Sequence, residues 1–197
     1  MKLKQPDLPF FPARIIITLG HLILAGIAVF LFSGLASAQK RDHLTDAETD
    51  LIRFHQELDK LIEVLIKAAD RRMAIINGTS QPDTKKKSNK DEPDWGEIPK
   101  GSRADLINDI AGILDEAITN IDDVGRRDEK NPLIARSLRR LTVAANLYAG
   151  QFNLIRSHTS NDDELSAIER VLDYTQQIVE VGGKLPPPAA EKTKSKP

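Results

Sequence analysis

Cysteine is absent from the 197-residue chain. Its absence excludes disulfide bonds, thiolate metal sites, thiol catalysis and lipid attachment to cysteine. Aromatic residues are also scarce, at 5% of the chain, so a core has to be built mainly from Leu, Ile, Val and Ala. The formal net charge is only -1, whereas nucleic-acid-binding domains usually carry a clear excess of positive charge. We therefore expect no nucleic-acid partner.

The chain does have a leader-like segment at residues 1–38. Basic residues precede an uninterrupted apolar run at 22–32, and small residues follow at 36–38. This pattern is typical of a secretory signal peptide and predicts cleavage before Gln39. The alternative is an uncleaved anchor, because the apolar stretch 15–35 is long enough to span a bilayer.

Both interpretations of residues 1–38 place the rest of the chain outside the cytoplasm. With cleavage, we expect a periplasmic or secreted protein. Without cleavage, we expect a single-pass membrane-anchored protein that faces away from the cytoplasm. Contact with a membrane is expected only in the second case.

Prolines divide the rest of the chain into stretches that can be helical, because proline disrupts a helix interior. The proline-free stretches are 39–81, 100–131 and 133–185. Each carries apolar residues at helical spacing rather than at the alternating spacing of strands. The sequence therefore predicts an all-α fold, with helix one within 39–78 and helices two to four within 103–183. We expect these helices to form a four-helix bundle.

Capping residues set the expected helix ends. The predicted spans are 46–76 for helix one, 103–124 for helix two, and 132 to near 157 for helix three. Helix four is expected to follow a cap at 160 or 161 and to end at 182–183. The expected N-terminal caps are Thr45 with Glu48, Ser102, Asn131 followed by Pro132, and either Ser160 or Asn161. The expected stops are Asn77-Gly78, Gly125 and Gly182-Gly183.

Each predicted helix carries one apolar stripe, and the stripes should form the core. In chain order they consist of Ala47, Leu51, Phe54, Leu58, Leu61, Leu65 and Ala68; Ile107, Ile110, Leu114, Ala117, Ile121 and Val124; Ile134, Leu138, Leu141, Ala145, Tyr148, Phe152 and Ile155; and Leu165, Ile168, Leu172, Thr175 and Val179. Two glycines, Gly112 and Gly150, lie inside predicted helices. Because glycine weakens a helix by about 1 kcal/mol relative to alanine, we expect each to have a packing reason.

Two segments lack the composition of a folded domain. Residues 79–102 contain three prolines and three consecutive lysines, and residues 184–197 are rich in Pro and then in Lys. Both patterns predict disorder, as a flexible linker and a flexible tail respectively. A linker of this length is compatible with either direction of helix one relative to helix two.

Charge suggests how helices two and three are oriented. Asp122 and Asp123 lie at the end of helix two, and Arg136, Arg139 and Arg140 lie near the start of helix three. Each set is unfavourable for the dipole of its own helix. An antiparallel pair would place the two sets side by side, where they offset one another.

The chain offers little to carry chemistry. A haem in a helical bundle needs ligands at matched heights, but His55 and Met73 share one predicted helix and His158 lies near the far end of helix three. No Glu-x-x-His pair or Gly-x-Ser-x-Gly motif occurs. We expect no catalytic residues, no metal or cofactor site and no enzymatic activity.

The candidate partner-contact residues are Trp95, Arg136, Arg139 and Arg140. Trp95 is the only tryptophan, and it is either an anchor for a partner or a side chain that fixes the end of the linker to the bundle, which we favour. The arginines either meet an anionic surface or pair with Asp122, Asp123 and Asp128, and the helix-dipole rule favours pairing.

These observations favour an exported, non-enzymatic helical bundle that acts through protein–protein contacts, as an envelope scaffold or adaptor. The partner is either an unknown protein or a second copy of the chain. The alternative is a helical bundle that carries a ligand or cofactor. The sequence resembles no family whose motifs can be placed on its residues.

Overall fold

The computed structural model describes residues 41–79 and 93–186. Across these two ranges the chain is all-α, with five helices and no strand. The helices are α2 (Asp46–Phe54), α3 (Leu58–Ile76), α4 (Arg103–Arg127), α5 (Pro132–Arg156) and α6 (Asp162–Gly183). The all-α prediction is confirmed. The predicted leader, most of the predicted linker and most of the predicted tail lie outside the described residues.

Helices α2, α4, α5 and α6 begin where local capping predicts, whereas the start of α3 at Leu58 has no side-chain cap. Thr45 and Glu48 form a capping box at α2, in which the Thr45 amide donates to Glu48 Oε2 at 2.9 Å. Ser102 caps α4, Asn131 caps α5 ahead of Pro132, and Asn161 rather than Ser160 caps α6. These starts depend on groups within about three residues of each other, which explains why they follow from sequence alone.

Helix one is not continuous, which corrects the predicted span 46–76. Residues 55–57 leave helical geometry, so α2 and α3 are separate helices joined by a tight connection. The break allows Glu48 of α2 to bond to Arg72 of α3. In an unbroken helix their separation of 24 positions in sequence would correspond to about 36 Å at 1.5 Å per residue. Phe54, predicted to be in the core, is instead 79% exposed.

Helix two also differs at its end, because α4 continues to Arg127 rather than stopping at Gly125. A glycine stop requires a positive φ angle. Gly78, after α3, has this geometry with φ of 66°, whereas Gly125 stays helical and the chain leaves the helix at Asp128.

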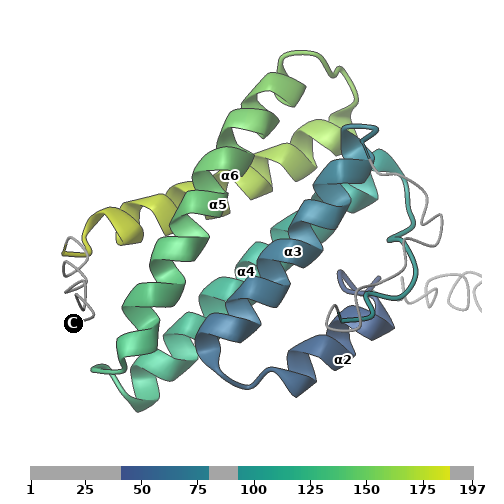
Figure 1. Ribbon diagram of the computed structural model, residues 1–197. Coiled ribbons are helices and arrows are strands. Elements are labelled where there is room, and N and C mark those ends of the chain that lie inside the picture. Colours follow the sequence, from purple (N-terminus) through teal and green to yellow (C-terminus); the bar gives the residue numbers. More distant parts are fainter. Residues whose placement is uncertain (1–40, 80–92, 187–197) are drawn as a thin grey trace, which may run out of the picture. The chain divides into compact units, whose positions relative to one another are not determined.

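Helices α3, α4, α5 and α6 share one apolar core (Figure 1). Helix α3 packs against α4 and α5, and α6 packs against the same two helices. The predicted stripes supply most of this core: Leu65, Ile110, Leu114, Leu141 and Phe152 are almost fully buried. All five helices belong to one compact unit that begins at Asp42.

Paired residues give the direction of α3. Its last turns meet the first turns of α4, because Arg72 Nε lies 3.5 Å from Asp109 Oδ2. Its first turn meets the first turns of α5, because Arg136 Nη1 lies 3.2 Å from Asp59 Oδ2. Helix α3 is therefore antiparallel to α4 and parallel to α5, which answers a question that linker length left open.

A series of polar contacts joins α3 to α5, and the paired residues lie 77 or 78 positions apart in sequence. Arg140 Nη1 donates to Glu63 Oε2 at 3.1 Å, and the Tyr148 hydroxyl donates to Asp70 Oδ1 at 2.7 Å. Burial and the Asp70 carboxylate raise the pKa of Tyr148, so the phenol remains a donor. These contacts fix the register of the two helices.

Two of the three arginines at the start of α5, Arg136 and Arg140, turn to α3 rather than to the end of α4. Arg136 pairs with Asp59 and Arg140 with Glu63, while Asp123 pairs with Arg126 of its own helix. Ion pairs from α5 to α3 therefore replace the expected pairing between the end of helix two and the start of helix three.

Candidate functional site

The most highly buried charges form a cluster where α2 packs against α3, with Asp109 of α4 beside it. Glu48 is fully buried and Arg72 is 1% exposed. Arg72 Nη2 donates to Glu48 Oε2 at 2.8 Å, and Arg72 Nη1 donates to Glu48 Oε1 at 3.0 Å. This two-point pairing matches the planar guanidinium to the carboxylate. We call these two residues, with Arg71, His43, Asp109 and Glu116, the Glu48–Arg72 cluster.

The cluster satisfies most of its polar groups internally. Arg71 Nη1 also donates to Glu48 Oε1, at 2.6 Å. The Arg72 Nη atoms also donate to the carbonyls of Ala68 at 2.8 Å and His43 at 2.7 Å, whereas Arg72 Nε makes no hydrogen bond and lies 3.5 Å from Asp109 Oδ2. Burial alone would raise the pKa of Glu48, but the bonds and charges of Arg72, Arg71 and Thr45 outweigh it and lower the pKa. The carboxylate therefore stays ionised as a partner for two arginines.

His43 extends the cluster to α4. Its Nε2 lies 2.7 Å from Glu116 Oε2, and this bond, opposed by partial burial, raises the pKa of His43. A Cβ at Gly112 would lie 2.9 Å from His43 Cγ. The packing reason expected for Gly112 is therefore the space that the imidazole occupies.

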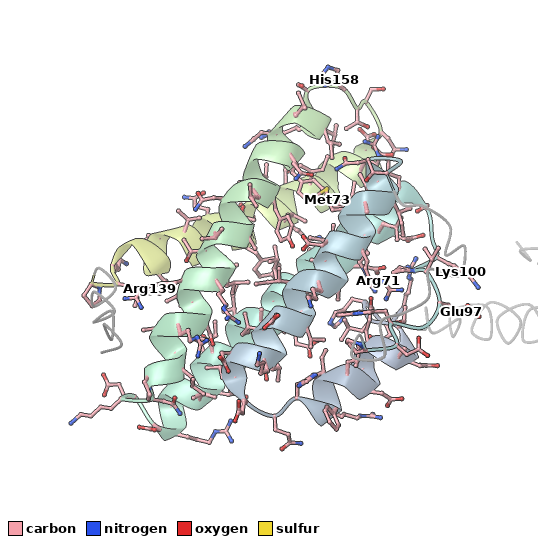
Figure 2. The ribbon with its side chains drawn as sticks, viewed as in Figure 1. Arg71, Met73, Glu97, Lys100, Arg139 and His158 are labelled. Atoms are coloured by element: carbon pink, nitrogen blue, oxygen red, sulfur yellow. The ribbon has the colours of Figure 1, made fainter. Side chains whose placement is uncertain are left out.

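Trp95 lies at the edge of the same cluster. The Arg71 guanidinium lies 5.6 Å from the centre of the Trp95 ring, within cation–π range. Arg71 Nη2 also donates to the Glu97 carbonyl at 2.7 Å, and Figure 2 shows Arg71 turned toward Glu97 and Lys100. Trp95 is half-buried against the core, an arrangement that agrees with its interpretation as the side chain fixing the linker end.

The other candidate contact residues lie elsewhere. Arg136 and Arg140 hold α3, and Arg139 Nη2 donates to the Pro186 carbonyl at 2.6 Å. Figure 2 shows Arg139 beside the end of α6 and Arg71 on the other side of the picture. The three arginines therefore share the first half of α5, and Trp95 does not belong to their surface.

A second feature lies on the outward face of α5. Val143, Leu147 and Leu154 are 64%, 61% and 64% exposed, and with Gly150 they follow one helical stripe. We call these four residues the α5 stripe. Scattered exposed apolar residues are ordinary, but aligned ones indicate a contact surface.

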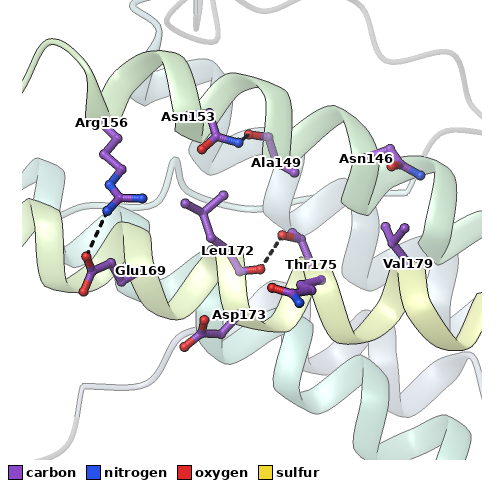
Figure 3. A pocket seen from close by; sticks show the side chains of 10 residues that line it. Asn146, Ala149, Asn153, Arg156, Glu169, Leu172, Asp173, Thr175 and Val179 are labelled. Atoms are coloured by element: carbon purple, nitrogen blue, oxygen red, sulfur yellow. Dashed lines mark hydrogen bonds and ion pairs between the residues drawn. The ribbon is translucent and has the colours of Figure 1, made fainter.

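An open groove of about 540 Å³ runs between α5 and α6. Figure 3 shows its lining, with the Arg156–Glu169 ion pair at one end and Leu172 and Val179 along the α6 side. Its neutral polar groups include Asn153, which donates to the Ala149 carbonyl at 2.8 Å. The groove borders the α5 stripe, since Asn146, Ala149 and Asn153 lie on the same helix.

The described residues hold no group of three or more His, Asp or Glu placed to bind a metal ion. Over the same residues, none of the helices combines the length and apolarity needed to cross a membrane. The Glu48–Arg72 cluster was not predicted from the sequence. Its signal is that Arg72 continues the apolar stripe of α3, in the steps from Leu65 through Ala69 to Arg72.

Comparison with known proteins finds no matching family model, no similar curated protein and no similar solved structure. The chain's own residues are therefore the basis for inferring its function.

Proposed function

We propose that the chain is an exported, non-enzymatic four-helix bundle that acts through protein–protein contacts, as an envelope scaffold or adaptor. The observation that carries this proposal is the α5 stripe. Its three large apolar side chains are each more than half exposed, and burying each against a partner is worth about 1.5–3 kcal/mol for full burial. Covering this apolar surface with a partner therefore lowers the free energy of the complex.

The charged groups of the Glu48–Arg72 cluster bond to one another, which supports a contact role over catalysis. A general acid or base needs a titratable group that can reach a substrate. Glu48 is instead enclosed by Arg71, Arg72 and the Thr45 amide. The Glu48–Arg72 cluster acts as a structural tie between α2 and the bundle.

Export is supported by the signal-peptide pattern of residues 1–38. Mature protein is expected to begin at Gln39, and N-terminal sequencing of protein from its host decides this. A full-length chain found only in the membrane pellet would establish the anchor instead.

The contact role is tested by placing a photo-crosslinking amino acid at position 147 or 154, with position 54 as a matched control. Phe54 is also exposed, at 79%, but lies on α2. Irradiation of the living host should give protein adducts from the two α5 positions. If neither α5 position gives an adduct above the control, the proposed contact role is wrong.

A ligand-carrying bundle is the second candidate, and the groove between α5 and α6 favours it. A volume of about 540 Å³ is within the range of small-molecule sites. A visible absorbance scan and native mass spectrometry of protein from its host would detect a retained cofactor or ligand. A mass equal to that of the bare chain, with no visible band, would count against this candidate.

A further inference from the structure

Gly150 lacks the packing partner that Gly112 and Gly182 have. A Cβ at Gly112 would meet His43, and one at Gly182 would meet Thr142. A Cβ at Gly150 would meet nothing within 4 Å. Since glycine weakens a helix interior, the bare backbone at Gly150 has no explanation within the chain's own fold. Close approach by another molecule supplies one, because glycine lets a neighbouring helix come near.

We propose that the α5 stripe is the interface between two copies of this chain, packed antiparallel about a two-fold axis. This inference rests on the proposed contact function and names its partner. The spacing of the stripe is symmetric about the midpoint between Tyr148 and Ala149. Val143 lies as far before that midpoint as Leu154 lies after it, and Leu147 and Gly150 are related in the same way.

Antiparallel pairing about this midpoint matches the large Leu147 to the small Gly150. Leu147 of each copy faces Gly150 of the second copy, so each leucine fills the space above a bare backbone. Val143 faces Leu154 of the second copy. A two-fold interface makes every such contact twice, so a short stripe can bury both sets of apolar side chains.

Charge selects the antiparallel arrangement. Arg136, Arg139 and Arg140 lie at the start of α5, and the exposed Asp162 and Asp163 follow its end. In the antiparallel pair, the arginines of one copy lie near these carboxylates of the second copy. A parallel pair would place arginines against arginines, and like charges across an interface disfavour it.

The first test is sedimentation velocity over a concentration series, using protein purified from its host. Wild type should show a reversible monomer–dimer equilibrium. Leu147→Glu should weaken it at least about tenfold, because it places a charge in a buried contact. Phe54→Glu is the matched control and should leave the dimer constant unchanged.

Gly150→Ala separates an interface role of Gly150 from a role in the stability of the monomer, because the two measurements below should change in opposite directions. It should raise the thermal midpoint of the monomer, because alanine favours a helix and nothing in the chain obstructs the added methyl group. It should also weaken dimerisation, because that methyl group meets Leu147 of the second copy. Opposite signs in the two measurements support the interface.

Orientation is measured with a spin label on Ser157→Cys, which is unique because the chain has no cysteine. In the antiparallel pair, the two labels should lie about 25 Å apart along the helix axis at 1.5 Å per residue. Labels side by side would overturn the antiparallel arrangement.

Two results would overturn the whole inference. One is a wild-type protein that stays monomeric at every concentration. The other is a dimer that neither Leu147→Glu nor Gly150→Ala weakens, since its interface would then lie elsewhere. The contact function itself fails separately, through absence of photo-adducts at positions 147 and 154. If the adducts have a mass other than twice that of the chain, the contact function stands but the partner is not a second copy.

Discussion

Arg72 shows how one residue can organise several segments. It is 1% exposed, and its guanidinium bonds to α2 through Glu48, to α3 through Ala68 and to the N-terminal approach through His43. Burying two charges is costly, and the attraction between them compensates only when the remaining donors are also bonded. The two Nη atoms of Arg72 meet this condition, whereas its Nε makes no hydrogen bond and lies 3.5 Å from Asp109 Oδ2. Removing one member of the Glu48–Arg72 pair would leave the other charge buried with fewer partners, so the losses from the two single removals should not add.

We expect Arg72→Met to lower the free energy of unfolding by about 3–5 kcal/mol, because it leaves a buried carboxylate with fewer partners. The double variant Glu48→Met with Arg72→Met should lose less than the sum of the two single variants. Urea denaturation of the three proteins checks this. As a control, Arg156→Ala breaks an exposed pair with Glu169 and should change stability by about 0–1 kcal/mol. Strictly additive losses would contradict the coupling.

His43 should make stability depend on pH. Its bond to Glu116, aided by the charges of Glu116, Asp42 and Asp109, raises its pKa above 6.5 in the folded chain. The protonated imidazole therefore stabilises the fold fully below pH 6.5, and this contribution is lost as pH rises through the folded-state pKa. The unfolding midpoint of wild type should fall as pH rises above 6.5. In His43→Gln the part of this fall that comes from the imidazole should be absent.

At the scale of elements, the break between α2 and α3 is the main departure from the sequence prediction. Residues 55–57 contain neither glycine nor proline, so nothing local marks the end of a helix. The helix ends there because folding back brings Glu48 to Arg72, a contact between residues far apart in sequence.

The break predicts how proline will be tolerated. Glu57 has φ of -73°, close to the value that proline requires, so Glu57→Pro should change the unfolding free energy by less than about 1 kcal/mol. Lys67→Pro, at an exposed position inside α3, should cost about 3 kcal/mol or more. Thermal denaturation compares the two. Equal losses would indicate that 55–57 is helical after all.

The same contrast explains what sequence reasoning could predict of the candidate site. Helix starts at Thr45, Ser102 and Asn131 were predictable because each cap and its partner lie within a few residues. The Glu48–Arg72 cluster was not, since its bonds join α2, α3 and α4. Arg136 and Arg140 were identified, but their partners, Asp59 and Glu63, lie on α3. That pairing depends on the parallel packing of α3 and α5.

At the scale of the whole molecule, α3 belongs to the same core as α4, α5 and α6. Ile62, Leu65, Ala68 and Ala69 are fully buried in it. Their burial against the other helices does not depend on the chain connection through residues 80–92.

Trypsin cleavage at the lysines of residues 85–90 should therefore leave the two fragments associated. They should elute together in size exclusion without denaturant and keep most of the helical circular dichroism, because the buried side chains of α3 gain about 1.5–3 kcal/mol each from the core. A soluble α3 fragment that elutes alone would contradict this packing. That result would indicate that α3 is a separate helix that binds a partner.

The position of Trp95 also gives the molecule a built-in optical probe. It is the only indole in the chain. The Arg71 guanidinium beside its ring ties it to the place where the last turns of α3 contact the first turn of α2. Its fluorescence emission therefore reports on the attachment of the N-terminal helix and the segment before α4, whereas far-ultraviolet dichroism is dominated by the four longer helices. If α2 detaches before the rest unfolds, the emission will shift at a lower urea concentration than the dichroism, and the gap between the two midpoints will measure how loosely the N-terminal helix is held.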